Sequence, residues 1–177
     1  ANYWNDLGQN WYIEQQYIKL YPVCRWAQPA VEGALALIRE HGINVSEIAK
    51  IKVETFHEAK RLTSIPTTTE QAQYSLPFSV ASAVVRGTIG VAEVTSNGLN
   101  DPQIIGLAKT VEIVEDNAFN DAFPAHRFAR THFHLQDGRI LSSRDTEAQG
   151  DPENKVPDQV IWDKLRGLAS PLLGKAW

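Results

Sequence analysis

A thiol, a guanidinium and a carboxamide lie close together in the sequence, at Cys24, Arg25 and Gln28. They stand just before Pro29, which suits the first turn of a helix because its missing N–H would have no partner there. Backbone N–H groups converge at a helix N-terminus and favour anions. The segment therefore predicts an anion-binding site, with an ordinary strand-to-helix connection as the alternative.

The basic and amide side chains of this segment suit carboxylate binding. Arg25 could hold a carboxylate through a two-pronged contact, and Lys19 could add positive charge. Gln28 can hydrogen-bond a carboxylate or a hydroxyl, but a carboxamide cannot act as a general base. The alternative is that both cations face water and that Gln28 only caps the helix.

One cysteine and two histidines have side chains suited to covalent or metal chemistry. Cys24 could be a nucleophile near a helix N-terminus, but no histidine is close in sequence, so a buried structural cysteine is favoured. His132 and His134 lie on one face of an expected strand and could supply two zinc ligands. Because no third ligand is evident, we expect no metal site and no metal requirement.

Helices and strands are expected to alternate irregularly around these residues. Asp137-Gly138, for example, predicts the turn of a hairpin. Because strict βα alternation is absent, we expect an α+β fold, with a small, largely antiparallel sheet and helices packed on it. Periodicity and composition predict strands at 11–21, 48–56, 109–115, 127–135 and 139–144, and helices at 29–41, 76–86, 102–108 and 158–168.

Overall composition argues against a nucleic-acid-binding or a membrane-spanning protein. The chain has 177 residues, of which 43% are hydrophobic and 21% charged, and a net charge of −4. We expect one domain, 1–177, with no nucleic-acid partner, because no basic stripe appears, and no membrane partner, because no apolar run approaches ~20 residues. A single cysteine fits the reducing cytoplasm. Methionine is absent even at position 1, so we expect that an N-terminal portion has been removed.

Two motifs resemble the MmgE/PrpD family, which includes 2-methylcitrate dehydratase, cis-aconitate decarboxylase and iminodisuccinate epimerase. The family pattern Lys-x-Tyr/Phe-Pro-x-Cys-x-x-x-His/Gln-x-Ala matches residues 19–30, and Ala-Gln-Phe/Tyr-Ser-Leu-Pro-Tyr/Phe-x-Val-Ala matches residues 72–81. Later segments are also similar, including 111–116, the Asp137-Gly138 turn and 150–154. The resemblance extends over nearly the whole chain.

The resemblance implies a domain of an enzyme of carboxylate metabolism. Family members carry an all-helical domain followed by a smaller α+β domain, so this chain is expected to be the second, lid-type domain without the first. The implied function is dehydratase, lyase or epimerase chemistry on small di- or tricarboxylates, in the cytoplasm, without a cofactor, and as a homodimer when full length. The main acid and base are expected in the absent helical domain, so the fragment alone should be inactive.

The expected substrate-contacting residues come from the two motifs. Many family members have His where this chain has Gln28, which leaves the type of reaction open. Tyr74 and Phe78 fall one helical turn apart and are expected to face one cleft or to pack in the core. The expected set is Arg25, Gln28, Lys19, Cys24 and Tyr74.

A non-catalytic interaction module is the alternative function. The aromatic residues between Tyr3 and Trp26 could dock on a protein partner. Removal of a neighbouring domain would expose apolar surface in the same way, so aromatic density does not distinguish the two functions.

Overall fold

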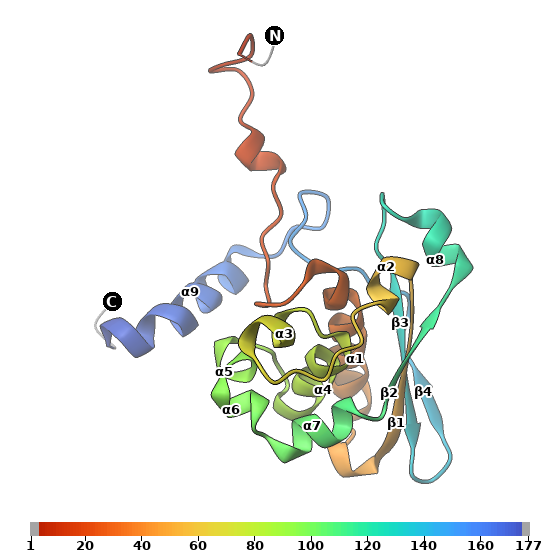
Figure 1. Ribbon diagram of the computed structural model, residues 1–177. Coiled ribbons are helices and arrows are strands. Elements are labelled where there is room, and N and C mark those ends of the chain that lie inside the picture. The colour runs from red at the N-terminus through yellow and green to blue at the C-terminus, as the bar shows by residue number, and fades with distance from the viewer. Residues whose placement is uncertain (1–3, 175–177) are drawn as a thin grey trace. The chain divides into compact units, whose positions relative to one another are not determined.

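The computed structural model describes residues 4–174, which form two compact units. The larger unit is Tyr21–Ala148, and the smaller one comprises the described chain up to Leu20 and from Gln149 onward. Figure 1 shows their elements. The smaller unit contains η1 (Tyr12–Gln15) and α9 (Asp158–Leu173); the larger contains η2 (Arg25–Ala27), α1 (Gln28–His41), η3 (Val45–Glu47), β1 (Ile48–Thr55), α2 (His57–Lys60), α3 (Thr69–Gln73), α4 (Leu76–Arg86), α5 (Val91–Val94), α6 (Ser96–Leu99), α7 (Pro102–Ala108), β2 (Val111–Glu115), α8 (Asn117–Ala122), β3 (Ala129–Leu135) and β4 (Ile140–Ser142).

The sheet of the larger unit has the strand order β2-β1-β3-β4. Strand β1 pairs antiparallel with β3, and β3 pairs antiparallel with β4, across the turn at Gly138, whose φ is +88°. Strands β1 and β2 are parallel, with Ile51 opposite Val111. The mixed, mostly antiparallel sheet with packed helices confirms the expected α+β fold.

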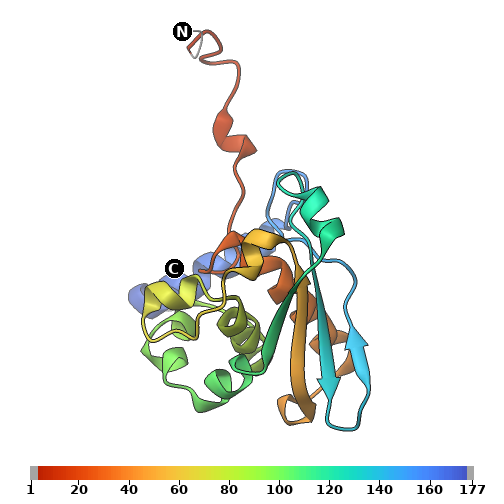
Figure 2. The ribbon, with the colours of Figure 1, turned by 45° about the vertical axis from the view of Figure 1, so that its right-hand side comes forward.

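Parallel neighbours require a crossover connection, and here α2–α7 supply it. Helices α1, α4 and α7 lie together on one side of the sheet, and α2 and α8 lie at the end where β1 and β2 finish (Figures 1 and 2). No helix of residues 4–174 is both long and apolar enough to cross a membrane.

Alternation along β1 decides which face of the sheet the helices cover. Ile51, Val53 and Thr55 are fully buried, as expected for a half-buried strand. The side chains between them point to the other face, where Lys50 pairs with Glu112 and Lys52 Nζ lies 2.8 Å from a carboxylate oxygen of Glu54. Ion pairs thus occupy the face that the helices leave open.

Helix α4 forms much of the core. The Ser75 hydroxyl accepts the Phe78 N–H at 3.1 Å and caps its start, and Gly87 ends it with φ +71°. Leu76, Phe78 and Val80 are fully buried. The helix predicted at 76–86 is therefore confirmed residue for residue.

The strand predicted at 11–21 is wrong. Residues Tyr12–Gln15 form a 3-10 turn, and no strand among residues 4–174 pairs with this segment. Trp11, Tyr12 and Ile13 are more than 60% exposed. A pattern of β-branched and aromatic side chains becomes a strand only where a ladder and a packed face are available, and this segment has neither within the described chain.

Helix α1 lies unusually close to β3 at Gly33. A Cβ atom there would stand 2.9 Å from the Thr131 hydroxyl oxygen and 3.0 Å from that of Ser143. These hydroxyls are engaged: Thr131 donates to the Ala30 carbonyl at 3.1 Å, and the Ser143 oxygen accepts the Thr131 N–H at 3.0 Å. Only a residue without a side chain keeps this contact and its hydrogen bonds.

We predict that Gly33→Ala destabilises the chain, because the new methyl group must displace buried hydroxyls. Overpacking of this kind costs about 1–3 kcal/mol of unfolding free energy. Gly106→Ala is the matched control: Gly106 is helical and exposed, with nothing within 4 Å of an added Cβ, so it should gain about 0.5–1 kcal/mol. Urea unfolding of both variants checks this, and equal effects would contradict it.

Candidate functional site

The N-terminus of α1 carries a group of buried or half-buried polar residues, which we term the polar cluster: Tyr21, Arg25, Gln28 and Glu32. Arg25 is 7% exposed and Gln28 is 1% exposed. One terminal nitrogen of Arg25 donates to Gln28 Oε1 at 3.1 Å, and the other donates to the Ala148 carbonyl at 3.4 Å. The reading of Arg25 as a solvated surface cation is therefore wrong.

Gln28 is the first residue of α1, but its side chain does not cap the helix. Its amide nitrogen donates to the carbonyl oxygens of Val23, at 3.1 Å, and Tyr21, at 3.4 Å. The amide nitrogen of Gln28 thus donates to the backbone of residues 21–23, which precede the helix, while its amide oxygen accepts a hydrogen bond from Arg25. This buried carboxamide ties the Tyr-Pro corner, Tyr21-Pro22, to the start of the helix.

Tyr21 and Glu32 form the second half of the polar cluster. The Tyr21 hydroxyl donates to Glu32 Oε1 at 2.8 Å, and Glu32 is only 5% exposed. Burial first, and the neighbouring Glu32 charge second, raise the pKa of Tyr21 well above its ordinary value. Since Gln28 holds the Tyr21 carbonyl, Tyr21 is fixed at both its backbone and its side chain.

A backbone hydrogen bond joins the two sequence motifs. The Cys24 N–H donates to the Gln73 carbonyl at 2.7 Å, which places the first motif beside the end of α3. Cys24 is a free, half-buried thiol, more open than the buried structural cysteine favoured by the sequence. The contact brings Cys24 and the Gln73-Tyr74 segment together.

Tyr74 and Phe78 do not share a surface. Tyr74 is 61% exposed, while Phe78 is fully buried in the core. Helix α3 ends at Gln73 and α4 begins at Leu76, so helical spacing does not apply across the break. Lys19 is exposed and belongs to the smaller unit, where its carbonyl accepts a hydrogen bond from Lys164.

One of the two candidate zinc ligands, His132, has other contacts. His132 Nδ1 lies 2.7 Å from the Ser142 hydroxyl, and His132 Nε2 lies 3.4 Å from Glu54 Oε2. No group of three or more His, Cys, Asp or Glu in residues 4–174 is arranged to hold a metal ion. The absence of a metal requirement stays a prediction.

Sequence reasoning missed Glu32, and it did not connect Tyr21 with α1. One signal was present: Glu32 follows Gln28 by four residues, which places both on one face of the helix. A glutamate on the otherwise apolar face of a buried helix indicates a buried partner. Nothing in the sequence identified that partner as Tyr21, eleven residues earlier.

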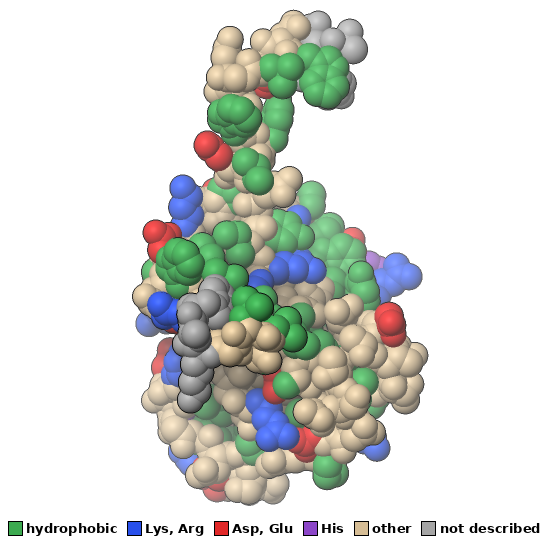
Figure 3. Space-filling view, turned by 90° about the vertical axis from the view of Figure 1, so that its left-hand side faces the viewer, with side chains coloured by type: hydrophobic (Ala, Val, Ile, Leu, Met, Phe, Trp, Pro, Cys, Tyr) green, Lys and Arg blue, Asp and Glu red, His purple; other side chains and the backbone are tan. Residues whose placement is uncertain are grey.

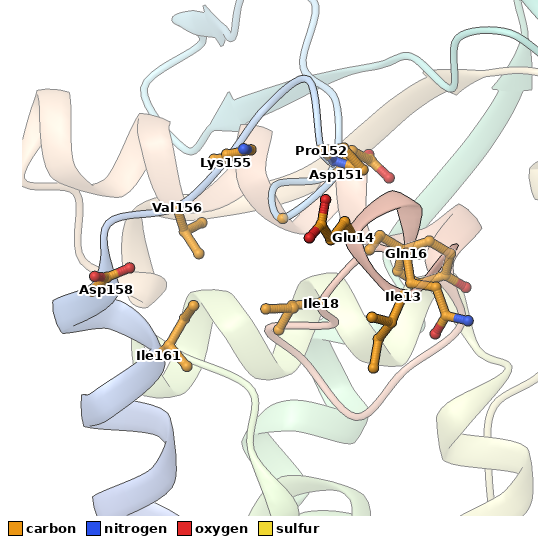
Figure 4. A pocket seen from close by; sticks show the side chains of 12 residues that line it. Ile13, Glu14, Gln16, Ile18, Asp151, Pro152, Lys155, Val156, Asp158 and Ile161 are labelled. Atoms are coloured by element: carbon orange, nitrogen blue, oxygen red, sulfur yellow. The ribbon is translucent and has the colours of Figure 1, made fainter. Parts of the chain in front are cut away.

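The smaller unit contains a pocket of its own, of about 490 Å³. Figure 4 shows the side chains of Ile13, Ile18, Val156 and Ile161 around it, with charged groups at its margin. Three carboxylates (Glu14, Asp151 and Asp158) and one ammonium (Lys155) line it. This excess of negative charge makes the pocket a poor receptor for a small carboxylate.

Gly150 holds the pocket wall against the N-terminal segment. The Ile18 N–H donates to the Gly150 carbonyl at 2.9 Å, and a Cβ at Gly150 would stand 2.2 Å from the Ile18 carbonyl oxygen. Gly150 also has φ +94°, which favours glycine. The 150–154 loop thus depends on glycine for two independent reasons.

We predict that Gly150→Ala opens this contact and speeds hydrogen exchange of the Ile18 amide. Gly138→Ala is the matched control, because Gly138 also has a positive φ, +88°, but nothing lies within 4 Å of its added Cβ. Both variants incur the backbone penalty of about 1–2 kcal/mol, but only Gly150→Ala should release Ile18. Unchanged Ile18 exchange in Gly150→Ala would contradict the close contact.

We predict that Tyr21→Phe costs about 1–3 kcal/mol at pH 7, because the buried Glu32 carboxylate loses its hydroxyl donor. The raised pKa also gives a pH dependence. Above about pH 10 the unfolded chain releases the phenolic proton while the folded one keeps it, so this stabilisation declines as pH rises. Urea unfolding at pH 8 and pH 11 should show the gap between wild type and variant narrowing; a widening gap would refute the assignment.

Comparison with known proteins supports one family. The sequence model described as the MmgE/PrpD C-terminal domain matches residues 21–176, which include the polar cluster, the sheet and α9. No curated protein matches the chain. Since the match starts at the first residue of the larger unit and covers most of the chain, this chain belongs to the MmgE/PrpD family and contains its C-terminal domain.

Proposed function

We propose that this chain is the C-terminal part of a cofactor-independent lyase or isomerase that acts on small di- or tricarboxylates. The observation that carries the proposal is the Arg25 guanidinium, held at the N-terminus of α1 by Gln28 and the Ala148 carbonyl. Family membership supports lyase or isomerase chemistry. Dehydration, decarboxylation and epimerisation all require groups that bind carboxylates, and a positioned guanidinium is suited to this.

In this proposal Arg25 contacts a substrate carboxylate, and Gln28 contributes through its hold on Arg25. Cys24 and the exposed Tyr74 belong to segments joined by the Cys24–Gln73 hydrogen bond, so both are expected at the same side of the substrate. Lys19 adds positive charge from the smaller unit. The half-buried Cys24 has a supporting role, since these reactions need no covalent step.

A general base must come from elsewhere. Within the polar cluster the carboxylate of Glu32 already accepts the Tyr21 hydroxyl, and Gln28 cannot take a proton. We therefore place the main acid and base in the helical domain that precedes this one in the family. The cytoplasm and a homodimeric full-length enzyme remain part of the proposal.

The smaller unit supplies the surface for that helical domain. Helix α9 has no buried residue, and its large apolar side chains are in contact with water: Trp162, Leu168 and Leu172 are 55%, 48% and 84% exposed. Figure 3 shows hydrophobic side chains standing in the open along the N-terminal segment, where Trp4 is 72% exposed. Tyr3, the first of the aromatic residues, lies outside the described residues. Apolar surface of this extent marks an interaction site, and the proposed occupant is the helical domain of the same protein.

We predict that Arg25→Lys in the enzyme that carries both domains lowers kcat/KM for its carboxylate substrate by about 10- to 150-fold. Lysine keeps the positive charge but cannot make the two parallel hydrogen bonds that a guanidinium makes to a carboxylate. A hydrogen bond to a charged group contributes about 1.5–3 kcal/mol. The substrate is first found by assaying a panel of di- and tricarboxylates. Arg61→Ala, which removes an exposed cation of the same unit, is the control and should behave as wild type.

Thermal unfolding of each variant separates a loss of binding from a loss of folding. A folded Arg25→Lys enzyme with unchanged kcat/KM would overturn the role of Arg25. Turnover of a carboxylate by residues 1–177 alone would overturn the placement of the acid and base. An enzyme with both domains that turns over no carboxylate of the panel would favour the non-catalytic interaction module.

A further inference from the structure

The chain passes between its two units twice, from Leu20 to Tyr21 and from Ala148 to Gln149. These crossings are 128 residues apart in sequence, yet both are fastened at the N-terminus of α1. On the first crossing, the Gln28 amide donates to the carbonyls of Tyr21 and Val23. On the second, Arg25 donates to the carbonyl of Ala148.

The two fastenings are also joined to each other. Arg25 donates to Gln28 Oε1 at 3.1 Å. One buried pair of side chains therefore holds both boundary residues of the larger unit, Tyr21 and Ala148. Both side chains are more than 90% buried, which shields these hydrogen bonds from competing water. The Tyr21 hydroxyl bond to Glu32 adds a third point of attachment on the first crossing.

We propose that Arg25 and Gln28 have a second, structural role, in which they anchor both crossings to α1. The larger unit then keeps one backbone geometry up to Tyr21 on the first crossing and up to Ala148 on the second. The anchoring itself does not depend on which reaction is catalysed.

Two substitutions separate the two crossings. Gln28→Glu keeps an acceptor for Arg25 but replaces the two donors by a carboxylate, which repels the Tyr21 and Val23 carbonyls. Arg25→Met removes the donor to Ala148 and leaves the Gln28 amide free to hold Tyr21. Ile104→Val is the control, because it weakens the core of the larger unit at a fully buried site that belongs to neither crossing.

Hydrogen exchange followed by mass spectrometry on the 177-residue chain is the test, and it needs no substrate. In Gln28→Glu we expect roughly ten-fold faster exchange in peptides spanning 18–24, and in Arg25→Met the same in peptides spanning 146–151, with β1 and α4 unchanged. Ile104→Val should accelerate the larger unit broadly. Arg25→Lys should give a smaller release at 146–151 and replaces Arg25→Met if that variant does not fold.

The proposal is overturned if Gln28→Glu and Arg25→Met exchange with the pattern of Ile104→Val, or if neither segment changes. It is distinct from the carboxylate role of Arg25: selective exchange without any effect of Arg25→Lys on kcat/KM would keep the anchor and reject the carboxylate contact. An effect on kcat/KM without selective exchange would do the reverse.

Discussion

The closeness of α1 to β3 at Gly33 is the constraint on which the rest of the larger unit depends. The helix can approach the strand this closely because Gly33 has no side chain and because the residues that face it, Thr131 and Ser143, present only hydroxyl oxygens. Thr131 donates to the Ala30 carbonyl, and Thr146 donates to the Pro29 carbonyl at 2.7 Å. These bonds hold the first turn of α1 on the sheet, and the first turn in turn holds Gln28 and, through it, Arg25.

The hydrogen bonds of the polar cluster offset the cost of burying its polar groups. In each of three hydrogen bonds a donor on one residue meets an acceptor on another: Tyr21 donates to Glu32, Gln28 to Val23, and Arg25 to Gln28. A buried polar group is costly when unpaired but specifies a single geometry when paired. The cluster therefore favours one orientation of the Tyr-Pro corner relative to α1, and with it one orientation of Arg25.

Local patterns predicted most of the larger unit. The alternation at 48–56, the Asp137-Gly138 turn and the helical segments at 76–86 and 102–108 gave strands and helices close to the observed ones, because each depends on residues near in sequence. The strand predicted at 11–21 failed because a strand needs a partner. Burial of Arg25 and its bond to Ala148, 123 residues away, depend on tertiary contacts that composition does not encode. The same holds for the separation of Tyr74 from Phe78, which follows from a break between two helices.

The parallel pairing of β1 with β2 has a consequence for how the chain folds as it is synthesised. Ile51 of β1 meets Val111 of β2, and its antiparallel partner is Phe133, so the central strand has no neighbour until 60 to 82 further residues have emerged. Helices α3–α7 lie within that interval and can form from local sequence, as can the β3–β4 hairpin. Strand β1 is thus the first strand of the sheet to leave the ribosome, and it waits longest for its partners. Contacts this distant in sequence slow folding, and during that delay the edges of the central strand remain open to unwanted pairing.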